Sequence, residues 1–385
     1  MHKEIKIIAI SLSCLMLAPF GSATYGQPTA SRNFHAGAVY VLTNQVENAV
    51  AVFNRGAQGA LTLAGDFPTG GAGDPVPSGG GGPAPDPLAS QGALVLDRGN
   101  QLLFAVNAGS NQISVLKIRG SALDLVDVVD SGGTRPISLT LHENLLYVLN
   151  AGGTPNITGF TIGDDGSLTP LAGSTQSLLG GATADPAQIG FSSDGTFLVV
   201  TEKAGNRLDT YTIDENGLPS APIDNPSNGM TPFGFAFNNA GTLLVSEAFA
   251  GAPNQAAVSS YAASEDGILN AISGSVPDLQ TAACWVVTTN NGKFAFASNT
   301  GSGSVSSYHV SGEDGTLTLV NSVAGDTGAG SAPIDMALNN SSRFLYVLVG
   351  ASQSVASFRV ERNGNLTSID SDGGLPLGAQ GIAAK

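Results

Sequence analysis

Residues 102 to 110 read LLFAVNAGS, and residues 145 to 153 read LLYVLNAGG, so an apolar run ends in Asn-Ala-Gly twice within 50 positions. Runs of the same kind return elsewhere in the chain. Self-similarity at a steady period is the sequence signature of an array of similar structural units. The last residues of the seven runs are Asn44, Asn107, Asn150, Lys203, Glu247, Asn299 and Val349.

A second series of short apolar segments precedes these runs, and proline opens most of its members. The start of the chain lacks its copy, and the segment GAQGIAA at 378–384 supplies one at the other end. We therefore expect this tail to join the N-terminal sheet as its innermost strand and to close a ring. The other members of the series are 91–96, 136–141, 186–191, 232–237, 283–288 and 333–338.

Asn-Gly and Asp-Gly dipeptides separate the segments, as at Asp194-Gly195 and Asn291-Gly292. Such dipeptides between apolar strands indicate hairpins, and we expect tight turns in which both central residues have positive φ. An alternating strand such as QISVLKI at 112–118 and a leucine-rich strand complete each unit. Four antiparallel strands repeated seven times at roughly 50 residues predict an all-β fold, a seven-bladed β-propeller closed by its C-terminal strand.

The N-terminus has the composition of a secretory signal peptide. An apolar stretch from Ile7 to Phe20 follows MHKEIK, and the small residues Gly21-Ser22-Ala23 come next. We expect a signal peptide at 1–23, one propeller domain at 24–385, and a secreted or periplasmic protein. The Gly/Pro-rich insertion at 67–87 is expected to form either a mobile surface loop or a lid over one mouth of the channel.

Charge and cysteine content exclude several classes of protein. The 385 residues carry 30 acidic and 15 basic side chains, a net charge of −15, which disfavours binding to nucleic acid or to anionic membranes. Only Cys284 is expected to remain after signal cleavage, so no intramolecular disulfide is expected. His35, His142 and His309 have no partner at metal-binding spacing. We expect a monomer with no metal and no cofactor.

In a propeller the innermost strand begins at the end of the ring where the second strand finishes. Polar residues at these positions should therefore surround one mouth of the central channel. They are Gln91, Asn107, Arg135, Ser138, Asn150, Gln188, Glu202, Lys203, Glu247, Trp285, Asn299, Asp335 and Gln380.

Three stretches give a more specific resemblance: SSDGTFLVV at 192–200, the run from Asn107 to 116, and EDGTLT at 313–318. They resemble the lactonase family of seven-bladed propellers, which includes bacterial 6-phosphogluconolactonases and fungal carboxymuconate-cyclising enzymes. The resemblance implies an acidic site residue at Glu247 and an analogue of the family's acidic-Arg pair at Asn206-Arg207.

The chain departs from the family pattern in two places. Pro186-Ala187-Gln188 lacks a histidine that members often carry beside an inner-strand proline. Asn299-Thr300-Gly301 lacks an arginine that members often carry after a second strand. Both changes remove groups suited to acid–base work or anion binding, so a phosphorylated or dicarboxylate substrate is disfavoured.

We predict Glu247 and Glu202 as general bases that activate water against a lactone carbonyl, although either carboxylate could instead be solvated or ion-paired. Gln188, Asn299 and Lys203 would orient the carbonyl. Lys203 and Arg207 could hold a carboxylate or balance neighbouring acids. Trp285 could stack on a ring or fill the channel, and Asn107 and Asn150 complete the binding set.

Two functions follow from these observations. The first is a secreted lactonase-like hydrolase that opens a small cyclic ester, a lactone or sugar derivative, at the channel mouth. The second is a non-catalytic propeller that binds a small carbohydrate, a peptide or an envelope protein partner there.

Overall fold

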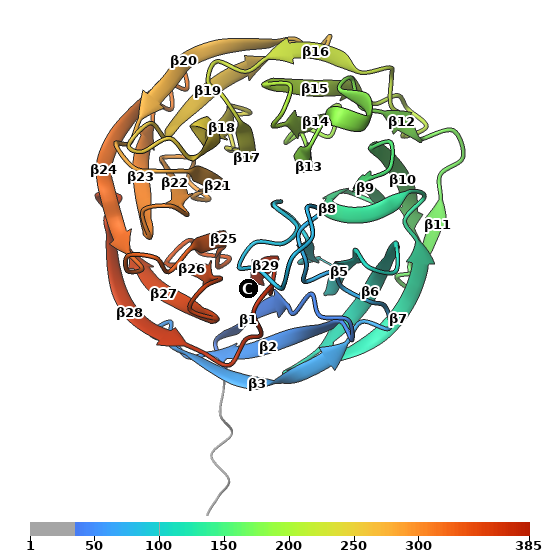
Figure 1. The fold of residues 1–385 in the computed structure, drawn as a ribbon, viewed down its shortest axis with the longest axis horizontal. Helices are drawn as coiled ribbons and strands as arrows, with labels where there is room; N and C mark the ends of the chain where they lie inside the picture. Colours follow the sequence, from blue (N-terminus) through green and yellow to red (C-terminus); the bar gives the residue numbers. More distant parts are fainter. Residues whose placement is uncertain (1–34, 100) are drawn as a thin grey trace, which may run out of the picture. The chain divides into compact units, whose positions relative to one another are not determined.

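The computed structural model describes residues 35–99 and 101–385, and these form a ring of seven antiparallel sheets. Figure 1 shows the sheets arranged around a central axis, with one edge strand of each sheet nearest to it. Each innermost strand contacts the innermost strand of the next sheet, and the series returns to its start. The predicted seven-bladed β-propeller is therefore confirmed. The predicted signal peptide lies outside the described residues.

The N-terminal and C-terminal ends of the described chain share one blade. Its strands, from the axis outward, are β29 (Ile382–Ala384), β1 (Gly37–Leu42), β2 (Ala49–Arg55) and β3 (Leu61–Pro68). Ala383 of β29 lies opposite Tyr40 of β1 in an antiparallel ladder. The C-terminal strand thus closes the ring on the N-terminal blade, as predicted.

The other six blades each use consecutive strands, from the axis outward. The second has β4 (Leu94–Asp97), β5 (Leu102–Asn107), β6 (Gln112–Arg119) and β7 (Ala122–Asp130). The third has β8 (Thr134–His142), β9 (Leu145–Gly152), β10 (Asn156–Ile162), β11 (Leu168–Pro170) and a short β12 (Gln176–Ser177) that pairs with β10. The fourth has β13 (Pro186–Phe191), β14 (Phe197–Glu202), β15 (Arg207–Thr212) and β16 (Ile223–Pro226).

The fifth blade has β17 (Pro232–Phe237), β18 (Leu243–Glu247), β19 (Ala257–Ala263) and β20 (Leu269–Pro277). The sixth has β21 (Ala283–Thr288), β22 (Phe294–Asn299), β23 (Ser304–Val310) and β24 (Leu317–Asp326). The seventh has β25 (Pro333–Leu338), β26 (Phe344–Val349), β27 (Ser354–Val360) and β28 (Leu366–Asp372). Two short 3-10 helices, Gly181–Thr183 and Phe249–Gly251, lie in connections, and no described helix is long and apolar enough to cross a membrane.

The second strand of each blade is almost wholly buried because neighbouring blades cover both of its faces. All six residues of β5 are buried, and so are all six of β26. This explains why these strands are continuous apolar runs rather than alternating ones. Tyrosines in them reach across the seam to the next blade, where the Tyr147 hydroxyl donates to the Gly217 carbonyl at 2.6 Å.

The hairpin turns differ from the prediction in one respect. Gly195 has φ +74°, but Asp194 is absent from the residues with positive φ, so the turn is not the expected tight type with two left-handed residues. Instead the Asp194 carboxylate accepts from the Thr196 amide at 3.1 Å and from the Ser192 hydroxyl at 2.7 Å. Aspartate side chains stabilise wider turns in this way, with glycine supplying the single left-handed position.

Most innermost strands carry a β-bulge just after they begin. The register between β25 and β26 shifts between Ile334 and Met336, which leaves Asp335 as the extra residue. Equivalent shifts occur in β8, β13, β17 and β21. A bulge re-aims the side chain of the extra residue, and these bulges lie where the channel begins.

Candidate active site

The predicted site residues at the ends of second strands are buried in the seams between blades. Glu202 pairs with Pro186 and Glu247 with Pro232, so both lie at the end of the ring where the innermost strands begin. Each side chain binds the connection that arrives from the preceding blade. The fully buried members are Asn107, Asn150, Glu202, Glu247 and Asn299.

The Glu247 carboxylate has three hydrogen-bond donors. Its Oε1 accepts from the Gly229 amide at 2.8 Å and the Ser259 hydroxyl at 2.5 Å, and its Oε2 accepts from the Ser275 hydroxyl at 2.6 Å. Burial raises the pKa of Glu247, and these hydrogen bonds lower it in part. A Cβ on Gly229 would lie 2.2 Å from Oε2, so only glycine allows this approach.

Glu202 forms a buried carboxyl pair with Asp209 on the adjacent strand. Glu202 accepts from the Gly180 amide at 3.0 Å, and Asp209 accepts from the Leu179 amide at 2.9 Å. Burial, reinforced by Glu202, raises the pKa of Asp209 to about 8. Asp209 therefore binds a proton more tightly than an exposed aspartate does.

Arg207 belongs to the same seam. Its guanidinium lies 4.0 Å from Glu202 and 3.7 Å from Asp224. It therefore partly balances these acids at the edge of the seam.

The three asparagines tie loops to strands in the same manner. The Asn107 side chain accepts from the Thr69 hydroxyl at 2.7 Å and donates to the Ser114 hydroxyl at 2.7 Å. Asn150 donates to the Ser131 carbonyl at 3.1 Å, and Asn299 donates to the Ser306 hydroxyl at 2.7 Å. Asn107 and Asn150 therefore join their blades to the strand connection before them, whereas Asn299 bonds β23 of its own blade.

The mouth at this end of the ring is covered by part of the insertion between β3 and β4. We call residues 86–91 the axial segment; Figure 1 shows the coil between these strands passing through the centre of the ring. The Ser90 hydroxyl donates to the Ile137 carbonyl at 2.9 Å, and the Ser90 backbone carbonyl accepts from Trp285 Nε1 at 2.9 Å and Gln380 Nε2 at 3.2 Å. These partners belong to three different blades, so the segment spans the channel.

Lys203 secures this segment. Its ammonium donates to the carbonyls of Ala89 at 3.0 Å and Pro186 at 3.1 Å, lies 3.3 Å from Asp185, and lies over the Phe233 ring. The side chain is only 9% exposed. Its donors are therefore directed at protein oxygens.

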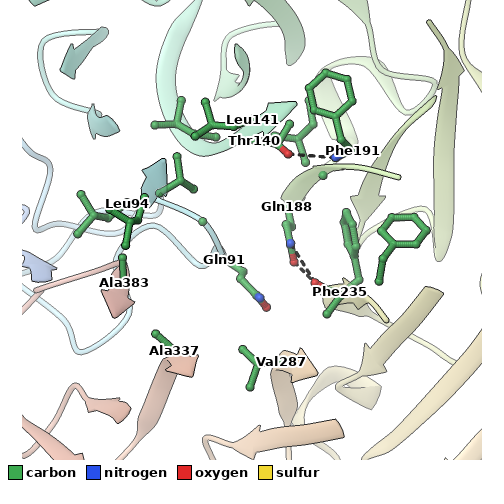
Figure 2. Close-up of a pocket in the computed structure, with 18 of the residues that line it drawn as sticks. Gln91, Leu94, Thr140, Leu141, Gln188, Phe191, Phe235, Val287, Ala337 and Ala383 are labelled. Carbon is green, nitrogen blue, oxygen red and sulfur yellow. Dashed lines mark hydrogen bonds between the residues drawn. The ribbon is translucent and has the colours of Figure 1, made fainter. Parts of the chain in front are cut away.

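Behind the axial segment the ring encloses a cavity of about 570 Å³, lined by the innermost strands of all seven blades. Gln188, one of the predicted binding residues, lines it and pairs its side chain with the Phe235 backbone at 2.7 and 3.0 Å, as Figure 2 shows. Gln91 pairs with the Val286 backbone in the same way. Gln188 thus joins the neighbouring innermost strands β13 and β17, whereas Gln91 ties the axial segment to β21 across the channel. Both line the closed end of the cavity.

The cavity opens at the opposite mouth, where the innermost strands end. Exposed Arg98, Ser193 and Asn290 and partly exposed His142 surround it there. Glu202 and Glu247 do not line the cavity, and Trp285 is fully buried beside it against Phe233. Of the residues to which the sequence assigned a catalytic or binding role, the structure therefore brings only Gln188 to the cavity wall.

Sequence reasoning placed Asp335 at the channel mouth and assigned it no role. It is 3% exposed, lines the cavity, and is the one acidic residue in the lining. Asp335 could have been recognised from the segment PIDMAL at 333–338. Among the innermost strand segments, this is the one with an acidic residue before its last position. Within residues 35–99 and 101–385, no cluster of three or more His, Cys, Asp or Glu side chains could hold a metal ion.

Comparison with known proteins agrees with this architecture. The model of the family described as "Lactonase, 7-bladed beta-propeller" matches residues 156–250 and 265–378. No curated protein sequence matches the chain significantly.

Solved structures share the fold at low sequence identity. The periplasmic gluconolactonase of Pseudomonas aeruginosa superposes with a TM-score of 0.68 at 15% identity, covering 90% of this chain and 98% of that one. A provisionally assigned 6-phosphogluconolactonase from Bacteroides uniformis superposes with a TM-score of 0.65 at 17% sequence identity. The match covers 89% of this chain and 99% of that one. Virginiamycin B lyase from Staphylococcus aureus superposes with a TM-score of 0.53 at 12% sequence identity. The match covers 76% of this chain and 88% of that one.

The last of these proteins is named for a different reaction, so the fold alone does not identify the chemistry. The family match extends over seam, channel and hairpin residues of five blades. The chain belongs to the lactonase family of seven-bladed β-propellers.

Proposed function

We propose that the protein is a lactonase-type hydrolase in which water opens a small cyclic ester inside the channel. The observation that carries this proposal is the cavity of about 570 Å³ on the axis of a lactonase-family propeller. A space of that size is typical of small-molecule sites. Gln188 lies in its wall, and an acidic group lies at its closed end.

The lining favours an uncharged lactone or sugar derivative as the substrate. Arg98 and His142 are the lining residues that could carry positive charge, and both lie at the open mouth, away from Asp335. Because the net charge is −15, the field of the whole protein also repels anions. A phosphate or carboxylate on the substrate would thus have no buried cationic partner at the closed end.

The sequence predicts Glu247 and Glu202 as general bases, with Lys203, Arg207, Trp285 and the three asparagines as their supporting set, and this prediction competes with a base located in the cavity itself. Burial raises the pKa of Glu247, which is the direction that a proton-accepting carboxylate needs. Its three hydrogen bonds in the seam, and its absence from the cavity lining, favour a structural role instead.

The experiment is a panel of unphosphorylated aldonolactones, their 6-phosphates and simple γ- and δ-lactones, followed by proton release in a pH-stat. We expect turnover of uncharged lactones, and a kcat/KM for each phosphorylated analogue at least tenfold lower. Catalysis by Glu247 would make Glu247→Gln inactive while folded. Absence of turnover across the panel would contradict the hydrolase proposal.

Non-catalytic binding is the second candidate, favoured by one observation: the axial segment covers the mouth where family resemblance places the site. A small carbohydrate, a peptide or an envelope protein would then bind without being changed. Calorimetric binding of a lactone or sugar, together with no proton release, would support this function over the first.

We also propose export of the protein, cleavage after residue 23, and a monomeric state. The sequence of the first 23 residues supports export. N-terminal sequencing of protein recovered from the periplasm or medium tests the cleavage, and sedimentation equilibrium tests the monomer.

A further inference from the structure

The carboxyl group of Asp335 lies at the closed end of the cavity, near the amides of Ile382 and Gly92, and one of its oxygens makes no hydrogen bond of normal geometry. Its Oδ1 accepts from the Met336 amide at 2.8 Å, and its Oδ2 is buried and has no hydrogen-bond partner at normal geometry. Buried polar atoms are nearly always paired with protein or water. An unpaired carboxylate oxygen in a cavity wall is therefore placed to bind a water molecule or a ligand.

Resting on the proposed hydrolase function, we propose that Asp335 is the general base of the reaction, acting on a lactone that enters through the open mouth. No part of the family resemblance assigned it this role. The base would therefore be a carboxyl group in the channel, separate from the glutamates in the blade seams.

The backbone holds Asp335 in this position at some energetic cost. The residue is the extra member of the bulge in β25 and has φ +37°, a left-handed conformation that non-glycine residues seldom adopt. Strained residues of this kind cluster at functional sites. Here the bulge turns the carboxyl group to the cavity while Ile334 and Met336 keep their ladder positions against β26.

The charge around Asp335 suits a base that works near neutral pH. Burial raises its pKa to about 7, and negative charge on nearby Asp86 contributes, while the amides of Met336, Ile382 and Gly92 lower it. Lys203 acts on Asp86 rather than on Asp335. A general base with a pKa near the working pH is substantially deprotonated there and still has a high affinity for the proton that it removes.

Cys284 also lies near Asp86 and Lys203, and its burial raises its pKa to about 12. The thiol is therefore neutral over the working range and does not compete as a base. Asp86 is then the one neighbour whose charge changes with that of Asp335.

The reaction balances with water as the sole co-reactant. The Asp335 carboxylate removes a proton from water as the water oxygen bonds to the ring carbonyl carbon. The tetrahedral intermediate then collapses, its ring carbon–oxygen bond breaks, and the proton passes to the leaving alkoxide. This proton transfer restores the Asp335 carboxylate. The product is a hydroxy acid, whose carboxyl group releases its own proton to solvent near neutral pH.

The test compares Asp335→Asn with a matched variant, Asp278→Asn. Asp278 is also a buried aspartate with a pKa raised to about 6 by burial, but it lies in a blade seam, where it accepts from the Ser306 hydroxyl at 3.0 Å. On the best substrate of the panel, we expect Asp335→Asn to lower kcat by about 100-fold or more. Asp278→Asn should keep kcat within about threefold, and circular dichroism should show both variants folded.

A pH profile gives a second measurement that does not depend on the folding of Asp335→Asn. We expect wild-type kcat/KM, corrected for spontaneous hydrolysis, to rise with pH and level off above about 7. Asp86→Asn removes the neighbouring negative charge, so it should move the midpoint to lower pH.

The outcomes separate this inference from the function on which it rests. An active wild type with an equally active, folded Asp335→Asn variant, or with a flat profile from pH 5.5 to 8.5, overturns the role of Asp335 alone. A wild type that hydrolyses no lactone overturns both.

Discussion

The residue that ends each apolar run acts mainly on shape. Asn107 and Asn150 do not reach the cavity; they bind the connection from the preceding blade and the next strand of their own. Glu202 and Glu247 do the same with a carboxylate in place of an amide. A polar group is needed there because each strand connection brings buried backbone amides and carbonyls that require partners.

Removing the Glu247 side chain should destabilise the fold. Glu247→Ala leaves the Gly229 amide and the hydroxyls of Ser259 and Ser275 without their acceptor in a buried seam, so we expect a loss of about 3 kcal/mol in the free energy of unfolding. Glu215→Ala, at an exposed turn, should change it by less than about 0.5 kcal/mol. Equal urea midpoints for the two variants would show that the seam hydrogen bonds contribute little.

At the scale of elements, a strand of three residues closes the whole ring. Val39, Tyr40 and Val41 of β1 pair with β29, and without it this edge of β1 would be open. The backbone amide of Gln380, just before β29 begins, also donates to the Leu42 carbonyl at 2.9 Å. An unpaired strand edge exposes backbone groups and can pair with other chains. The tail therefore contributes more to the stability of the ring than its three-residue strand suggests.

Deleting residues 376–385 should open the ring. The first blade would lose its innermost strand, and β4 and β25 would lose the strand that lies between them. We expect the melting temperature to fall by at least about 10 °C, or the protein to aggregate. Differential scanning calorimetry of the truncated and full chains checks this, and an unchanged melting temperature would rule out closure by the tail.

At the scale of the whole molecule, the ring holds several carboxyl groups that favour their protonated form. Burial is the largest cause for each: it raises the pKa of Asp209 to about 8, of Asp335 to about 7, and of Asp86 and Asp278 to about 6. Aspartate in an unfolded chain has a pKa near 3.9. Between about pH 4 and 8 the folded protein therefore binds more protons than the unfolded chain.

The free energy of unfolding should consequently fall as pH rises from 5 to 8. A carboxyl group whose pKa is higher in the folded protein than in the unfolded chain contributes its full stabilisation at a pH below its unfolded pKa. This contribution is lost as the pH rises through the folded pKa. We expect urea unfolding to show greater stability at pH 5, and Asp209→Asn to reduce the difference by on the order of 2 kcal/mol. Asp214→Asn, a fully exposed site, is the control, and a rise in stability from pH 5 to 8 would contradict the prediction.

The fold was readable from the sequence because local patterns decide it. The ends of β5, β18, β22 and β26 coincide with the apolar runs, since a strand buried on both faces must be continuously apolar. The missing first strand and the tail at 378–384 predicted the closure. The turn type could not be predicted in the same way, because an Asp-Gly pair such as Asp194-Gly195 fits more than one type of hairpin turn. The surrounding hydrogen bonds select the type.

The sequence by itself determined a seven-bladed ring, its closure, its acidic surface charge and its resemblance to lactonases. Tertiary structure alone decided that Glu247 lies in a seam, that residues 86–91 cover one mouth, and that Asp335 lines the cavity. The physical reason is that strand pattern depends on which faces are buried, which neighbouring residues in the chain report. The direction of a polar side chain depends instead on bulges and on partners from other blades, hundreds of residues away.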